Sequence, residues 1–170
     1  MGKIIAEKEL LLPSLKNAIQ TMQLQKEIKA SKFENVFQQA LVNLTYTYFW
    51  SSQKVKDMLN VYDITQQQFN VLRILRGQHP SPSTINLIKS RILDKMSDTS
   101  RIVDRLIQKG FVEKTVNVHD KRAVDIIITS KGLALLRKMD KEVDFSTFIV
   151  NSLTEDEAEQ LNVLLDKMRG

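Results

Sequence analysis

Polar side chains suited to hydrogen bonding gather in two short segments of the sequence. The first segment supplies hydroxyl, carboxylate and guanidinium groups that we expect on the exposed side of a helix: Ser97, Asp98, Thr99, Ser100, Arg101 and Arg105. The second segment is basic: His119, Asp120, Lys121 and Arg122. Short hydroxyls can donate to a phosphate or a base edge, and arginine can form paired bonds with guanine or hold a phosphate. Both segments therefore indicate recognition of a polyanion, and of double-stranded DNA in particular.

Other chemistries find little support. The sequence contains no cysteine, which excludes disulfides, thiolate metal sites and thiol redox sensing. Its two histidines, His79 and His119, stand in separate turns, so we expect no zinc or iron site. The sequence has no glycine-rich phosphate loop and no recognisable Ser-His-Asp triad. We expect a protein that is not an enzyme and that uses no cofactor or metal.

The charge distribution also favours a polyanionic partner. The 170 residues carry a net charge of +5. Residues 81–122 hold nine basic and five acidic side chains, whereas residues 123–170 hold six basic and nine acidic ones. A basic middle can meet a polyanion while an acidic end stays away from it. No apolar run approaches the roughly 20 residues that span a membrane, and acidic residues interrupt the N-terminus, so we expect a soluble cytoplasmic protein.

The period of the apolar residues predicts the elements that must position the polar segments. Thr65 and Gln68 form a capping box, Ser83 or Thr84 caps the following helix, and Ser97 caps the helix that carries the first polar segment. The predicted helices of this first part cover residues 13–28, 33–60, 65–77, 84–93 and 97–109.

The period then changes from 3.6 to 2 residues. Strands are predicted over residues 111–117 and 123–129, with Val124, Ile126 and Ile128 alternating with other residues, and residues 118–122 form a polar turn between them. A helix is expected from Thr129 to Val150, and a second capping box starts the last helix at residue 154. The predicted fold is mainly α with one small β-hairpin.

Three short helices followed at once by a hairpin form a winged helix-turn-helix arrangement. The third helix of such a unit fits the major groove, and the hairpin, or wing, reaches the adjacent minor groove or backbone. Taken alone, residues 97–110 are typical of an ordinary amphipathic surface helix. Taken alone, the basic turn at residues 118–122 is typical of a solvated hairpin. The two features together favour DNA binding over a winged-helix protein-interaction module, which keeps the fold but lacks a basic reading face.

At this point the sequence resembles the MarR family of bacterial regulators. The resemblance rests on residues 96–114 (MSDTSRIVDRLIQKGFVEK), the following His119-Asp-Lys-Arg, and Ile128-Thr-Ser-Lys-Gly132. It covers about residues 33–168. It implies that Ser97 to Arg101 begin the recognition helix. It also implies that Asp120 and Arg122 match the family's wing residues, with Arg122 entering the minor groove.

The resemblance further implies a homodimer built from the first and last helices. We expect residues 33–62 and 130–170 to form dimerisation helices, residues 63–129 the DNA-binding region, and residues 1–32 a helical N-terminal extension. The function it implies is that of a transcriptional regulator, expected to be a repressor of a pseudo-palindromic operator that a small-molecule effector releases. Two departures from the family pattern are the helix at 84–92, which lacks the usual small and acidic residues, and the long extension.

Two further groups of residues have a functional and a structural interpretation. The first group can be interpreted as phosphate contacts or as a solvated surface, and consists of Lys89, Arg91 and Lys95. An aromatic cluster suits core and interface packing, or a pocket for the small aromatic or phenolic effectors that the family often binds. The candidate pocket residues are Tyr46, Tyr48, Phe49, Trp50, Phe69 and Arg73.

Overall fold

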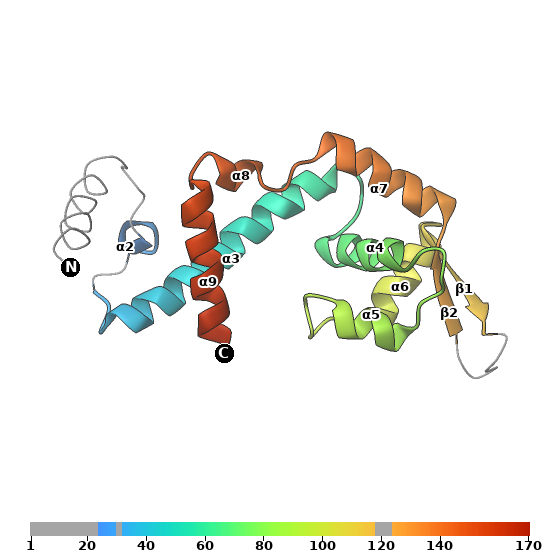
Figure 1. Ribbon diagram of the computed structural model, residues 1–170, viewed down its shortest axis with the longest axis horizontal. Coiled ribbons are helices and arrows are strands. Elements are labelled where there is room, and N and C mark those ends of the chain that lie inside the picture. Colours follow the sequence, from blue (N-terminus) through green and yellow to red (C-terminus); the bar gives the residue numbers. More distant parts are fainter. Residues whose placement is uncertain (1–23, 30–31, 118–123) are drawn as a thin grey trace, which may run out of the picture. The chain divides into compact units, whose positions relative to one another are not determined.

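The computed structural model describes residues 24–29, 32–117 and 124–170 (Figure 1). The chain falls into two compact units, residues 1–50 and residues 51–170. Within the described ranges the elements are helices and one two-stranded antiparallel hairpin, which confirms the predicted fold class. No helix in these ranges is long and apolar enough to cross a membrane.

The first unit contains helix α2, Leu24–Glu27, and the beginning of helix α3, Val36–Asn60. Helix α3 begins where the side chain of Asn35 accepts hydrogen bonds from the backbone N–H groups of Phe37 and Gln38, at 3.0 and 2.9 Å. These bonds satisfy donors that have no partner inside the helix. The predicted start at residue 33 is therefore three residues early. Of the predicted helix 13–28, residues 13–23 lie outside the described residues.

The second unit holds the C-terminal end of α3 and all later elements. Strands β1 and β2 pair with Val112 opposite Ile128 and Val116 opposite Val124. Ser83 bridges Ile126, which attaches the segment before α5 to the hairpin. The elements are α4 Gln66–Gln78, α5 Ile85–Arg91, α6 Thr99–Gln108, β1 Val112–Val116, β2 Val124–Ile128, α7 Ser130–Glu142, α8 Thr147–Val150 and α9 Glu155–Arg169.

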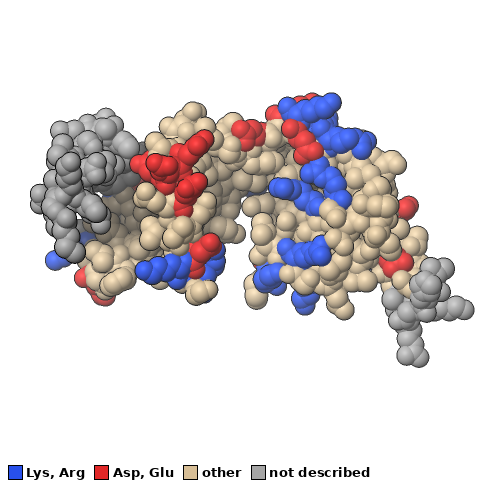
Figure 2. Space-filling view, in the orientation of Figure 1, with Lys and Arg blue, Asp and Glu red and all other residues tan. Residues whose placement is uncertain are grey.

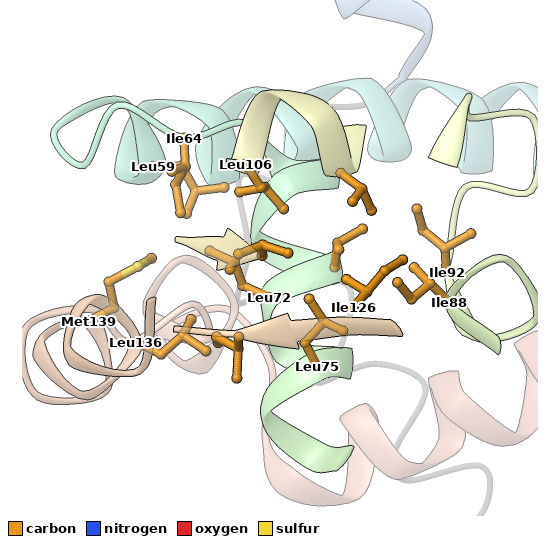
Figure 3. Close-up of a cluster of buried hydrophobic side chains, with 14 residues drawn as sticks. Leu59, Ile64, Leu72, Leu75, Ile88, Ile92, Leu106, Ile126, Leu136 and Met139 are labelled. Atoms are coloured by element: carbon orange, nitrogen blue, oxygen red, sulfur yellow. The ribbon is translucent and has the colours of Figure 1, made fainter. Parts of the chain in front are cut away.

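One apolar core joins α4, α5, α6, α7 and the hairpin (Figure 3). Leu72, Ile88, Leu106, Ile126 and Leu136 supply one fully buried side chain from each of these elements. Burying a side chain of this size contributes about 1.5–3 kcal/mol. Because all five elements share these contacts, the core fixes the position of α6 relative to the hairpin.

Threonine side chains start four helices of the second unit. Thr65, Thr84, Thr129 and Thr154 each accept a hydrogen bond from the backbone N–H three residues later. Thr65 and Thr154 form the two predicted capping boxes, which are confirmed. Of the two caps considered for α5, the structure uses Thr84, and the side chain of Ser83 is buried.

The predicted continuous helix from Thr129 to Val150 is wrong. Helix α7 ends at Glu142, and Val143 has an extended backbone. The Asp144 carboxylate then accepts hydrogen bonds from the Ser146 hydroxyl at 2.7 Å and the Ser146 backbone N–H at 2.8 Å, which lowers the pKa of Asp144. A short acidic side chain competes in this way with helical hydrogen bonding. The chain therefore turns before the short helix α8.

Gly132 lies in the first turn of α7, at a place where a methyl group does not fit. A Cβ there would lie 2.4 Å from the backbone oxygen of Phe111 and 2.8 Å from Cγ1 of Ile128. The Phe111 oxygen is itself held by the backbone N–H of Thr129 at 3.0 Å. We predict that Gly132→Ala lowers the free energy of unfolding by about 1–3 kcal/mol, because overpacking forces the backbone to shift. Denaturant titration measures this change.

Gly77→Ala is the matched control. Gly77 lies in α4, and a Cβ there would meet no atom within 4 Å. Alanine in a helix is favoured over glycine by about 0.5–1 kcal/mol, so this substitution should stabilise the protein. Equal effects of the two substitutions would contradict the proposed clash at Gly132.

Candidate nucleic-acid interface

Helix α6 has one buried face and one polar face. Thr99, Val103 and Leu106 are buried against the core. The exposed residues of the helix are all polar: Ser100, Arg101, Asp104, Arg105 and Gln108. This division follows from the 3.6-residue period, since buried positions recur every three or four residues. The helix is thus held by its apolar side and presents hydroxyl and guanidinium groups on the other.

The N-terminus of α6 differs from the prediction. Asp98, not Ser97, is the N-cap, and its carboxylate accepts from the backbone N–H of Arg101 at 3.1 Å. The Ser97 hydroxyl donates instead to Asp94 Oδ2 at 2.6 Å. This bond, with a second one from the backbone N–H of Met96, lowers the pKa of Asp94. Because the Ser97 hydroxyl is bound to Asp94, the carboxylate of the next residue, Asp98, caps the helix.

Thr99 also departs from the prediction of an exposed side chain. Only 4% of Thr99 is exposed, and its hydroxyl has no hydrogen-bond partner among the described residues. Thr99 lies four residues before Val103, so both point to the same side of the helix. The prediction that Thr99 belongs to the exposed reading face is corrected accordingly.

Arg101 and Arg105 stand one turn apart on the exposed side of α6. Within the described ranges neither guanidinium has an ion-pair or hydrogen-bond partner. Both arginines line a shallow cavity of about 300 Å³ between α6 and the N-terminal turn of α4, together with Gln67 and the carboxylates of Asp94 and Asp98. These two guanidinium groups can donate hydrogen bonds to a phosphate or to the edge of a guanine.

An ion pair that the sequence did not reveal joins α6 to the wing. Lys114 Nζ in β1 lies 2.6 Å from Asp104 Oδ1. Asp104 would otherwise place an uncompensated negative charge on the polar face of the helix. At the other end of α6, Lys109 Nζ lies 2.8 Å from Asp63 Oδ2. The sequence shows a basic residue, Lys114, in the predicted strand. It does not show that this lysine pairs with Asp104.

The base of the wing is described, but its tip is not. Asp125 in β2 is 8% exposed, and it accepts a hydrogen bond from Asn117 Nδ2 at 2.9 Å. The predicted alternation holds for Ile126 and Ile128, which are buried, but not for Val124, which is 42% exposed, or for the buried Asp125. The four predicted wing residues lie outside the described residues: His119, Asp120, Lys121 and Arg122.

Basic side chains are spread over the second unit. Figure 2 shows several separate patches of Lys and Arg on its visible face, divided by neutral surface. Lys89 and Arg91 are exposed in the last turn of α5. Lys95 follows α5, and its Nζ donates to the backbone oxygen of Ser90 at 2.7 Å. The phosphate contacts predicted for these three residues stay predictions.

The residues predicted to line an aromatic pocket are divided between the two units. Tyr46, Tyr48, Phe49 and Trp50 belong to the first unit, where the rings of Tyr48 and Phe49 meet edge to face at 5.5 Å. In the second unit the ring of Phe69 packs on that of Phe145 at 5.0 Å, and the Arg73 guanidinium lies 5.8 Å from the Phe69 ring centre. Phe69 thus packs beside the segment that follows α7, and Arg73 covers its ring.

Potential metal ligands are not grouped in the described part of the chain. Among the described residues no group of three or more His, Cys, Asp or Glu could hold a metal ion.

Comparison with known proteins places this geometry in a family. Residues 64–124 match the sequence model of the MarR family. The multiple antibiotic resistance protein MarR of Escherichia coli is 34% identical over 123 residues, which cover 69% of this chain and 84% of that protein. The transcriptional repressor IacR of Pseudomonas putida is 28% identical over 68% of each chain.

The solved structures agree. A mutant of E. coli MarR complexed with operator DNA superimposes with a TM-score of 0.66 at 27% identity, covering 86% of this chain and 98% of that one. Such overlap includes the helices outside the winged unit as well as the winged unit itself. The chain therefore belongs to the MarR family of transcriptional regulators and carries the family's DNA-binding winged helix.

Proposed function

We propose that the protein is a homodimeric repressor that binds a pseudo-palindromic operator through α6 and the wing. The observation that carries this proposal is the division of α6. Its apolar side is locked into the core, while Arg101 and Arg105 on the other side lack partners within the described ranges. A related regulator with the same fold has been solved on its operator.

In this proposal α6 enters the major groove and selects the sequence. The hydroxyl of Ser100 and the guanidinium of Arg101 lie in the first turn of the helix, where recognition helices meet base edges. Asp104, further along the helix, carries a charge that would repel phosphate. Lys114 compensates it at 2.6 Å and holds the hairpin close to α6. Arg122 in the wing supplies phosphate or minor-groove contact.

Exposed apolar side chains on two helices support the dimer. Phe37 and Leu41 are exposed on α3 in the first unit, and Leu164 and Met168 are exposed on α9 in the second. Apolar patches of this kind usually mark an interaction surface. The first and last helices are also the segments that we assign to dimerisation. A symmetric dimer places two α6 helices about one helical turn of DNA apart.

Repression follows from occupancy. A dimer that covers two successive major grooves blocks other proteins from the same DNA, and the relative IacR is named a transcriptional repressor. Binding of a small molecule outside the DNA face would release the operator by favouring the free form of the protein. In the second unit, Phe69 and Arg73 remain candidate contacts for such an effector.

Arg101→Ala should change which sequences the protein prefers. A bidentate arginine contact with guanine contributes about 1–3 kcal/mol of discrimination, and its loss should relax selectivity at one position of each half-site. Selection from random duplex DNA with the wild type and the variant measures the change. Wild-type selection that enriches no pseudo-palindrome would favour an interaction module and contradict the proposal.

Arg122→Ala should weaken binding to every sequence by a similar factor. Losing one phosphate contact reduces the slope of log affinity against log salt by about 0.9. Fluorescence anisotropy with the selected operator and with a nonspecific duplex, over a series of salt concentrations, measures both effects. Lys141→Ala is the control, since Lys141 is exposed at the end of α7 that is distant from the hairpin. An unchanged affinity of Arg122→Ala would overturn the assigned role of the wing.

Leu164→Asp should convert the dimer into a monomer. An aspartate at this position would place an unpaired charge in an apolar interface, which costs several kcal/mol. Sedimentation velocity gives the molar mass, and operator affinity should fall together with it. Asn162→Asp introduces the same charge on another side of α9 and should leave the dimer intact. A dimeric Leu164→Asp variant would show that α9 does not use this face for association.

A further inference from the structure

A cavity in the first unit lies between α2 and the N-terminal half of α3. Its volume is about 290 Å³, which is enough for a small organic molecule. Five of its six lining side chains are polar or aromatic, and one is aliphatic. The lining residues are Leu24, Glu27, Asn43, Tyr46, Thr47 and Trp50. The DNA-binding face of α6 belongs to the other unit, so this cavity requires an explanation of its own.

The charge of the lining is negative. Among the described residues that line the cavity, Glu27 is the one carboxylic acid, and none is a lysine or an arginine. The Tyr46 hydroxyl donates to Glu27 Oε2 at 2.7 Å, which holds the carboxylate beside the ring. This bond is the main cause that raises the pKa of Tyr46, so the tyrosine hydroxyl stays protonated and remains a donor. The remaining lone pairs of Glu27 can accept further donors.

Aromatic rings complete the arrangement. Tyr46 and Trp50 lie one helical turn apart on α3 and are 36% and 40% exposed. Ring faces attract cations, tryptophan most strongly, and aromatic cages beside an acid are a recurrent way to bind ammonium groups. An anionic ligand would meet only repulsion from Glu27.

We propose that this cavity binds a small organic cation, a quaternary or protonated amine, between Glu27 and the rings of Tyr46 and Trp50. The amide of Asn43 and the hydroxyl of Thr47 are placed to hydrogen-bond a polar substituent of such a ligand. The binding itself does not depend on the proposed function. Only a regulatory role, in which the cation acts as the effector, would rest on the proposed function.

The cavity occupies a different side of α3 from the surface assigned to dimerisation. Asn43, Tyr46, Thr47 and Trp50 follow the i, i+3, i+4, i+7 spacing of one helix face. Exposed apolar residues such as Phe37, Leu41 and Tyr48 lie on roughly the opposite face at 100° per residue. Association through that apolar stripe therefore does not use the side of α3 that lines the cavity.

Trp50 makes the proposal directly measurable. It is the one tryptophan of the sequence, so intrinsic fluorescence of the full-length protein reports on the cavity. Choline is the probe, and 3,3-dimethyl-1-butanol is its neutral counterpart of the same shape. We expect a saturable fluorescence change with choline and an affinity at least about fivefold lower for the alcohol, the size of effect that a cation–π contact gives.

Variants separate the acid from the rings. Glu27→Gln should weaken choline binding by about tenfold, since one charge pair is lost, whereas Glu34→Gln removes an exposed acid of the same unit that does not line the cavity and should have no effect. Circular dichroism checks that each variant is folded. Tyr46→Phe keeps the ring and should retain binding within about twofold, because the ring face makes the cation contact.

Three results would overturn the proposal: no saturable response to choline, equal affinity for the neutral alcohol, or unchanged affinity in a folded Glu27→Gln protein. The measurement is made without DNA. Its failure would leave operator binding unaffected, and a failure of operator binding would leave the cation titration interpretable.

Discussion

The structure of the second unit depends on the burial of one side of α6. Val103 and Leu106 are completely buried in a core shared with α4, α5, α7 and the hairpin. Each buried side chain of this kind contributes about 1.5–3 kcal/mol, so rotation of α6 about its axis would cost several such contacts. Because the rotation is fixed, the set of exposed residues is fixed as well. Arg101 and Arg105 are presented to solvent as a consequence of packing on the opposite side.

Local signals in the sequence predicted most of the helix starts. The capping boxes at Thr65 and Thr154 need only residues within one turn, and both are present. The start of α6 was predicted wrongly because two adjacent residues, Ser97 and Asp98, are both good caps. The choice depends on Asp94, which binds the Ser97 hydroxyl and leaves Asp98 to cap the helix. The capping preference of a residue does not predict that another side chain, here Asp94, will bind its hydroxyl.

Contacts between distant elements were harder to predict. Thr99 looked like an exposed hydroxyl, but its position one turn before Val103 buries it. The pair between Lys114 and Asp104 depends on how β1 lies against α6, which the period of either segment does not give. This pair matters for the site because it offsets an acid on the reading face and attaches the hairpin to the helix. The sequence thus predicted the elements of the interface better than the contacts between them.

The aromatic residues of α3 are close in sequence but lie on different sides of the helix. Tyr46, Tyr48, Phe49 and Trp50 are nearly consecutive, and the sequence interpretation treated them as one pocket. Residues one or two positions apart on a helix do not face each other, whereas residues four apart do. Tyr46 and Trp50 consequently share a cavity with Glu27, while Tyr48 lies on the same side of the helix as the exposed Phe37 and Leu41. One helix can therefore offer an acidic aromatic cavity on one side and an apolar association surface on the other, and a small organic cation and a second subunit need not compete for it.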